Sequence, residues 1–136
     1  MGPHKRKEKP GYVTLTPAEW NLMEFIWDNT PCLAREVVAH CAQKVGWART
    51  TTLTILRHLV DKGAVDCDES GPLNRYTARI DREETVRRET DSFLERIYQG
   101  SVSMMLSAMT QRQQLSPPEL EALRALLREA EGGECV

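Results

Sequence analysis

The chain has 136 residues, of which 40% are hydrophobic and 28% are charged, and its formal net charge is −2. This length suits one ordinary domain, or a small domain with an oligomerisation segment, and the composition is typical of a globular protein. No apolar run approaches the ~18–20 residues that span a bilayer, and no signal-peptide core follows the basic N-terminus. We therefore expect a cytoplasmic protein.

Basic residues are concentrated in the N-terminal part of the chain. Residues 1–80 hold eleven Lys and Arg against nine Asp and Glu, a balance of +2, whereas the balance of residues 81–136 is −4. Residues 1–13 are expected to form a basic flexible arm, which is either a solvated tail or a source of phosphate contacts. The basic residues of this arm are Lys5, Arg6, Lys7 and Lys9.

The sequence predicts a first helix from Thr16 to about Trp27. Thr16 can cap the free backbone N–H groups, Pro17 suits the first helical position, and Glu19 completes a capping box. Apolar residues then recur at helical spacing and are expected to face a core. These residues are Trp20, Met23, Ile26 and Trp27.

A second helix is expected from about Ala34 to Lys44 and a third from Ala48 to Lys62, with a turn at Gly46-Trp47. Gly63 terminates the third helix as a C-cap glycine. Its inward stripe comprises Thr52, Ile55, Leu56 and Leu59. The remaining surface carries hydroxyl and basic groups, as in a helix that contacts DNA. The candidate DNA-binding residues on it are Arg49, Thr50, Thr51, Leu53, Thr54 and Arg57.

Two short strand-like runs follow, Ala64–Cys67 and Arg75–Ala78, and a turn-rich linker separates them. A β-hairpin directly after a DNA-contacting helix forms the wing of a winged helix-turn-helix. We therefore predict that residues 14–80 form a winged helix-turn-helix DNA-binding domain.

At Asp81 the chain changes to a series of amphipathic helices. A long helix is expected to about Tyr98, a Met-rich helix over 101–109, and a last helix from Ser116. These helices have too little mutual core to be stable alone, which favours pairing with a second chain. The alternative is packing against the winged helix in a monomer. The fold class is thus mainly α, with a helical dimerisation domain at 81–131 and a flexible tail at 132–136. The candidate dimerisation residues are Val86, Phe93, Leu94, Ile97, Tyr98, Leu120, Leu123 and Leu127.

The chemistry of the candidate DNA contacts is that of major-groove recognition. Threonine hydroxyls exchange hydrogen bonds with base edges, and their methyl groups contact the thymine methyl. Arg49 can bind a guanine or a phosphate, and Arg57 a phosphate. Lys44 and Arg75 are two further phosphate candidates. For each of these cations the alternative is a solvated surface group.

Several motifs occur in a specific order and spacing over about residues 14–128. They are Leu15-Thr16 with Ala18-Glu19-Trp20, Thr51 with Thr54 and Leu56, Lys62-Gly63, Arg75-Tyr76, and Phe93-Leu94 before Tyr98 and Gly100. In this arrangement the chain resembles the BlaI/MecI/CopY family of bacterial transcriptional repressors, the penicillinase repressor family. The resemblance implies a homodimer that binds a palindromic operator in double-stranded DNA and blocks transcription.

The resemblance also implies how repression ends. In antibiotic-responsive members a membrane-bound sensor metalloprotease triggers cleavage of the repressor, archetypally at an Asn-Phe bond. The corresponding candidate cleavage region here is Leu106, Ser107, Ala108 and Met109, which lacks that pair. Copper-responsive members bind metal through repeated Cys-x-Cys pairs, whereas this tail has only Cys135, so no metal site or cofactor is expected. Leu53 stands where some members carry a basic residue, which implies a different base preference.

Other functional classes receive less support. No enzyme is expected, because His4, His40 and His58 lack partners at catalytic spacing and no Gly-rich phosphate loop occurs. Adjacent helical residues point about 100° apart, so His40 and Cys41 are expected to pack rather than bind metal. Two alternatives stay open. One is a winged-helix adaptor that binds protein. The other is a repressor that senses a ligand or soft metal through Met104, Met105 and Met109.

Overall fold

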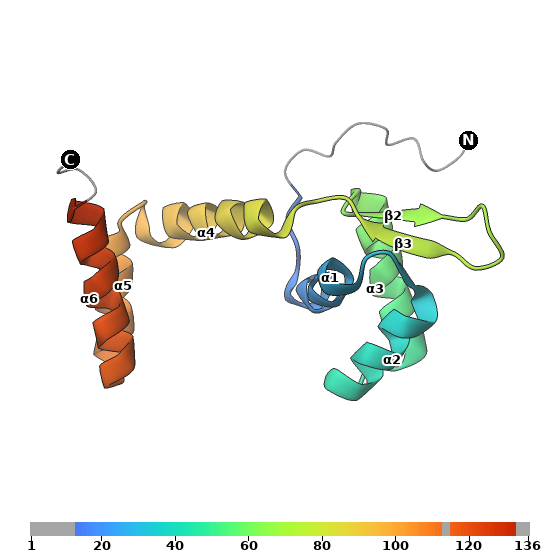
Figure 1. The fold of residues 1–136 in the computed structure, drawn as a ribbon, viewed down its shortest axis with the longest axis horizontal. Helices are drawn as coiled ribbons and strands as arrows, with labels where there is room; N and C mark the ends of the chain where they lie inside the picture. Colours follow the sequence, from blue (N-terminus) through green and yellow to red (C-terminus); the bar gives the residue numbers. More distant parts are fainter. Residues whose placement is uncertain (1–12, 113–114, 133–136) are drawn as a thin grey trace. The chain divides into compact units, whose positions relative to one another are not determined.

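The computed structural model of this chain describes residues 13–112 and 115–132. Helices make up most of these residues, with one small antiparallel sheet (Figure 1), which confirms the predicted mainly α class. Two compact units are distinguished, Met1–Thr90 and Asp91–Val136, and the division falls inside one helix. The predicted domain boundary at residue 80 stays a prediction. The elements are α1 (Pro17–Asn29), β1 (Cys32–Leu33), α2 (Ala34–Lys44), α3 (Arg49–Lys62), β2 (Val65–Asp68), β3 (Arg75–Ala78), α4 (Arg82–Tyr98), α5 (Val102–Arg112) and α6 (Pro117–Gly132).

The predicted capping box opens α1. The Glu19 backbone N–H donates to Thr16 Oγ1 at 3.1 Å, and the Thr16 N–H donates to Glu19 Oε1 at 2.9 Å. Pro17 occupies the first helical position, where its missing N–H breaks no helical bond. These short-range bonds satisfy two of the donors that a helix start leaves free.

One apolar core joins α1, α2, α3 and the sheet. Thr52 is fully buried, as the predicted inward stripe of α3 requires, whereas Ile55 is only partly buried. The largest fully buried side chains of the core are Leu22, Met23, Ile26, Leu56, Leu59, Val37 and Val65. The C-terminal end of α3 is marked by Gly63, whose φ of 88° lies in the left-handed region that favours glycine. The predicted C-cap is therefore confirmed.

The sheet has three strands in the order β1-β3-β2, not the two strands that were predicted. The extra strand is β1, which pairs Cys32 with Tyr76 and Leu33 with Arg75. Two residues carry no detectable alternation, so only their pairing with β3 identifies them as a strand. On the other side of β3, Cys67 of β2 is opposite Tyr76.

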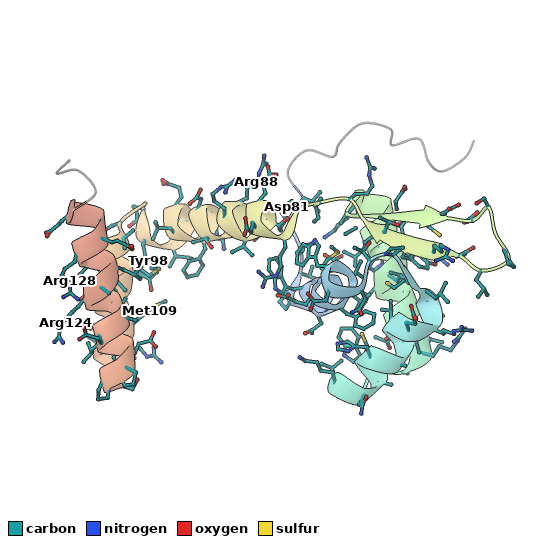
Figure 2. All side chains as sticks on the ribbon, in the orientation of Figure 1. Asp81, Arg88, Tyr98, Met109, Arg124 and Arg128 are labelled. Atoms are coloured by element: carbon teal, nitrogen blue, oxygen red, sulfur yellow. The ribbon has the colours of Figure 1, made fainter. Side chains whose placement is uncertain are left out.

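The second unit contains the last turns of α4, then α5 and α6. Gly100, with a φ of 81°, follows α4, which agrees with the predicted helix break. No residue of α5 or α6 is buried, both helices lying in the described part of the chain. Glu121 pairs with Arg124 and Arg128 along the solvent-exposed surface of α6, where Figure 2 labels both arginines. Eight large apolar side chains outside the first unit's core are exposed: Phe93, Ile97, Val102, Met104, Met109, Leu120, Leu126 and Leu127.

None of the helices in the residues described here is long and apolar enough to cross a membrane.

Candidate nucleic-acid interface

The exposed face of α3 carries most of the candidate DNA-binding residues. The helix buries Thr52, Leu56 and Leu59, so the side chains that alternate with them around the helix are turned to solvent. The exposed set is Arg49, Thr50, Thr51, Thr54 and Arg57. Five side chains with hydroxyl or guanidinium groups thus share one solvent-facing surface of a single helix.

The start of α3 is electrostatically suited to an anion. Ala48 is the N-cap and makes no side-chain capping bond, and the first turn of this helix contains no acidic residue. The first backbone N–H groups of a helix point outward at its positive end. Arg49 adds a formal charge at the first helical position. A negatively charged ligand is therefore favoured at this end of α3.

Leu53 differs from its neighbours on α3. It is partly buried and packs against the core, and it borders a hollow with Leu56 and Tyr76. Its side chain therefore lies at the edge of the exposed face, between α3 and the sheet.

The two candidate phosphate contacts outside α3 have different surroundings. Lys44 is exposed at the last residue of α2. Arg75 is exposed on β3 but lies directly opposite Asp68 on β2. Hydrogen bonds from Ser70, at 2.9 Å and 2.7 Å, and the charge of Arg75 hold the pKa of Asp68 below its usual value. Part of the charge of Arg75 is thus offset by a carboxylate.

A bond far apart in sequence holds the other end of α3. The Lys62 ammonium donates to the Glu19 carboxylate and, at 2.7 Å, to the Thr14 carbonyl. The capping residue of α1 therefore also anchors the last turn of α3. This contact joins residues 43 positions apart and was not predicted from the sequence.

A cluster of tryptophans and charged groups fixes the start of α4 on α1. Glu24 accepts from Trp20 Nε1 at 2.9 Å and from two nitrogens of Arg82 at 3.1 Å and 3.0 Å. The Arg82 guanidinium also lies 5.9 Å from the centre of the Trp27 ring, and Trp27 Nε1 donates to the Ile80 carbonyl at 2.9 Å. The polar edges of both tryptophans are thus satisfied at this junction.

The cysteines and histidines of the first unit pack rather than gather. His40 stacks on Phe25 with ring centres 4.5 Å apart, and Cys41 is buried. Cys32, Cys41 and Cys67 are unpaired, and burial, assisted by Glu36, raises the pKa of Cys32 to about 11. In the part of the chain that is described, no group of three or more potential ligands could hold a metal ion. Cys135 lies outside the described residues.

The candidate dimerisation residues are divided by exposure. Four are exposed on α4 and α6, namely Phe93, Ile97, Leu120 and Leu127. Four are half-buried, namely Val86, Leu94, Tyr98 and Leu123. Phe93 and Tyr98 make an edge-to-face contact with ring centres 5.9 Å apart. The candidate cleavage region, 106–109, lies inside α5.

Arg35 and Leu73 were not identified from the sequence. Arg35 is exposed near the start of α2, where the sequence suggested only a helix that packs against the core. Leu73 is 51% exposed in the loop that joins β2 to β3. A basic residue and an apolar residue of this kind occur on many protein surfaces. Only their position beside α3 and the wing makes them candidates.

Comparisons with known proteins agree with this geometry. A family model described as penicillinase repressor matches residues 15–129. A penicillinase repressor of Bacillus licheniformis is 30% identical over 115 residues, which cover 85% of this chain and 90% of that protein. The methicillin resistance regulatory protein MecI of Staphylococcus aureus is 22% identical over 113 residues, covering 83% of this chain and 92% of that protein.

A solved structure provides a further match. The solution structure of the DNA binding domain of the repressor BlaI has 27% identity and a TM-score of 0.50, and it covers 55% of this chain and 92% of that one. The resemblance to the family and the winged-helix fold are both confirmed. The chain belongs to the penicillinase repressor family.

Proposed function

We propose that this chain represses transcription as a homodimer, in which α3 of each protomer binds one half of a palindromic operator. DNA-binding repression is the activity for which its relatives are named. The observation that carries the proposal is the solvent-facing surface of α3, where Arg49, Thr50, Thr51, Thr54 and Arg57 are exposed together. A protein of this function is not an enzyme, and it works in the cytoplasm, where its DNA lies.

The roles of these residues follow from groove chemistry. Thr50, Thr51 and Thr54 meet base edges, where hydroxyl and methyl groups discriminate between bases. Arg49 contacts a guanine or a phosphate at the start of α3. Arg57 and Lys44 contact phosphates, which position the protein without carrying sequence information. Arg75 contributes less, because Asp68 faces it on the neighbouring strand.

The second unit supplies the argument for a second copy. Its exposed leucines on α6, with 60% of Leu126 and 62% of Leu127 accessible, have no cover from the described residues of their own chain. Burying such side chains stabilises an association by about 1.5–3 kcal/mol each when they become fully buried. A dimer presents two copies of α3 to two half-sites, so the second contact becomes intramolecular and overall affinity rises.

Relief of repression by a membrane-bound sensor metalloprotease is a separate part of the proposal. Its support is family membership. Residues 106–109 are helical within α5. A protease cleaves extended backbone, so cutting there requires local unfolding of that helix. Incubating the protein with the candidate protease and mapping the cleaved bond by mass spectrometry tests this step.

A gel shift tests recognition by α3. Arg49→Ala/Thr51→Ala should abolish preference for the operator found upstream of the chain's own gene. The matched control is Arg87→Ala/Thr77→Ala, which removes the same side-chain types from exposed positions on α4 and β3. The control should keep that preference. Equal operator preference in both double variants would contradict recognition through α3, and a wild-type protein that ignores DNA at low salt would favour the adaptor.

Sedimentation tests the dimer. Leu127→Asp should give a monomer with a folded winged helix and greatly weakened operator binding. Leu73→Asp makes the same change at an exposed leucine outside the second unit and should leave the protein dimeric. Full operator affinity in a wild-type protein shown to be monomeric at the assay concentration would refute the dimer.

A further inference from the structure

The wing has two faces of opposite electrostatic character. Successive residues of a strand point to opposite faces, and directly opposed residues of paired strands share a face. Tyr76 and its partner Cys67 therefore share one face of the sheet. Thr77 with Asp66, and Arg75 with Asp68, share the other.

A cationic hollow of about 320 Å³ lies on the Tyr76 side, where the starts of α2 and α3 meet the loop of the wing. Arg35 and Arg49 both line it, and both are exposed. Asn74 and Tyr76 add an amide and a phenol as hydrogen-bonding groups. No carboxylate occurs among the described residues that line the cationic hollow: Leu33, Ala34, Arg35, Arg49, Pro72, Leu73, Asn74 and Tyr76.

The neighbouring hollows differ in this respect. Arg57 borders a hollow that also contains Glu69, and Arg75 borders one that also contains Asp68. A third hollow is lined by Asp66, Cys67, Asp68, Glu69, Ser70 and Thr77, and includes three carboxylates. An anion beside any of these three hollows meets negative charge, whereas in the cationic hollow it meets two guanidinium groups.

We propose that the cationic hollow is a binding site for one phosphate of the DNA backbone, held by Arg35 and Arg49. This inference rests on the proposed function and adds Arg35 as a positioning residue. A guanidinium group matches the geometry of phosphate oxygens and can donate two parallel hydrogen bonds. The backbone then passes along the Tyr76 face of the wing, and the face with Asp66 and Asp68 is turned away from DNA.

Because a phosphate contact carries no sequence information, Arg35 and the threonines of α3 should behave differently. Removing Arg35 should weaken operator and unrelated DNA by the same factor and keep their ratio. One lost phosphate contact should also reduce the slope of log K against log salt by about 0.9. The threonine substitutions should change the ratio instead.

The experiment measures the affinity of the full-length protein for operator and scrambled duplexes at four salt concentrations. The variants are Arg35→Ala and Arg35→Gln, which both remove the charge, and Arg35→Lys, which keeps it without the planar fork. The matched control is Arg87→Ala, which removes an equal exposed charge from α4. Circular dichroism checks that each variant is folded.

The expected result is a slope lowered by about 0.9 in both neutral variants, with an unchanged specificity ratio and a wild-type slope in the control. An unchanged slope in the neutral variants, or an equal fall in Arg87→Ala, would overturn the phosphate site. A changed specificity ratio would instead assign Arg35 to base contact and overturn it too. If the wild type binds no DNA, both this inference and the proposed function fail. If the wild type binds its operator specifically and only the slope test fails, the proposed function survives.

Discussion

The contact between Glu19 and Lys62 predicts a measurable stability coupling between the first and third helices. The Glu19 side chain is 5% exposed and that of Lys62 is 34% exposed. Glu19→Gln keeps an acceptor for the Thr16 N–H but removes the charge that binds the ammonium. Glu19→Ala removes the cap as well.

The expected cost follows from these two contributions. A hydrogen bond to a charged group contributes about 1.5–3 kcal/mol, and desolvation of the buried carboxylate offsets part of it. Glu19→Gln should therefore lower the free energy of unfolding by about 1–2 kcal/mol, since Lys62 is also partly screened by solvent. Glu19→Ala should lower it by a further ~1 kcal/mol, the usual cost of a lost cap.

The pH dependence of this contact has a definite sign. Burial by itself raises the pKa of Glu19, but hydrogen bonds from Lys62 and Thr16 and the charge of Lys62 lower it, and the net direction is downward from 4.5. A carboxyl with a lower pKa in the folded state stabilises the fold above its unfolded pKa. That stabilisation is lost as the pH falls through the folded pKa.

A double-mutant cycle with Glu19→Gln and Lys62→Met measures the coupling by urea unfolding at fixed protein concentration, because association also affects stability. The coupling energy should be about 1–2 kcal/mol at pH 7 and should fall toward zero near pH 3. A coupling energy below about 0.3 kcal/mol at pH 7 would refute the argument, as would a coupling of equal size at both pH values.

Three further predictions concern the core of the first unit. Leu59→Ala, at a side chain with 0% exposure, should lower the free energy of unfolding by about 2–5 kcal/mol in urea titrations, and a loss under ~1 kcal/mol would mean that the site collapses freely. Thr52→Val should raise the melting temperature by a few degrees, because the buried Thr52 Oγ1 lacks a hydrogen-bond partner; a lower melting temperature would reveal a bond to that hydroxyl. Cys32, with a pKa of about 11, should react with a thiol reagent at pH 8 roughly 100-fold more slowly in the folded than in the unfolded protein, and equal rates would contradict its burial.

Local features of the fold could be predicted from the sequence. The capping box at Thr16 and Glu19, the C-cap at Gly63 and the start of α4 after Asp81 each depend on residues within a few positions. Hydrogen bonds over such short separations are encoded by residue type and spacing. Helical periodicity likewise identified the buried side of α3, and therefore which side is exposed.

The parts that the sequence could not reveal all depend on contacts between distant segments. Strand β1 exists because β3, more than 40 residues later, pairs with it. The Glu19–Lys62 contact and the Asp68–Arg75 opposition arise in the same way. Sequence alone therefore determined which helix offers side chains to DNA. Tertiary packing decided which cations face carboxylates, and it brought Arg35 and Arg49 to one hollow, because charge proximity depends on distance in space.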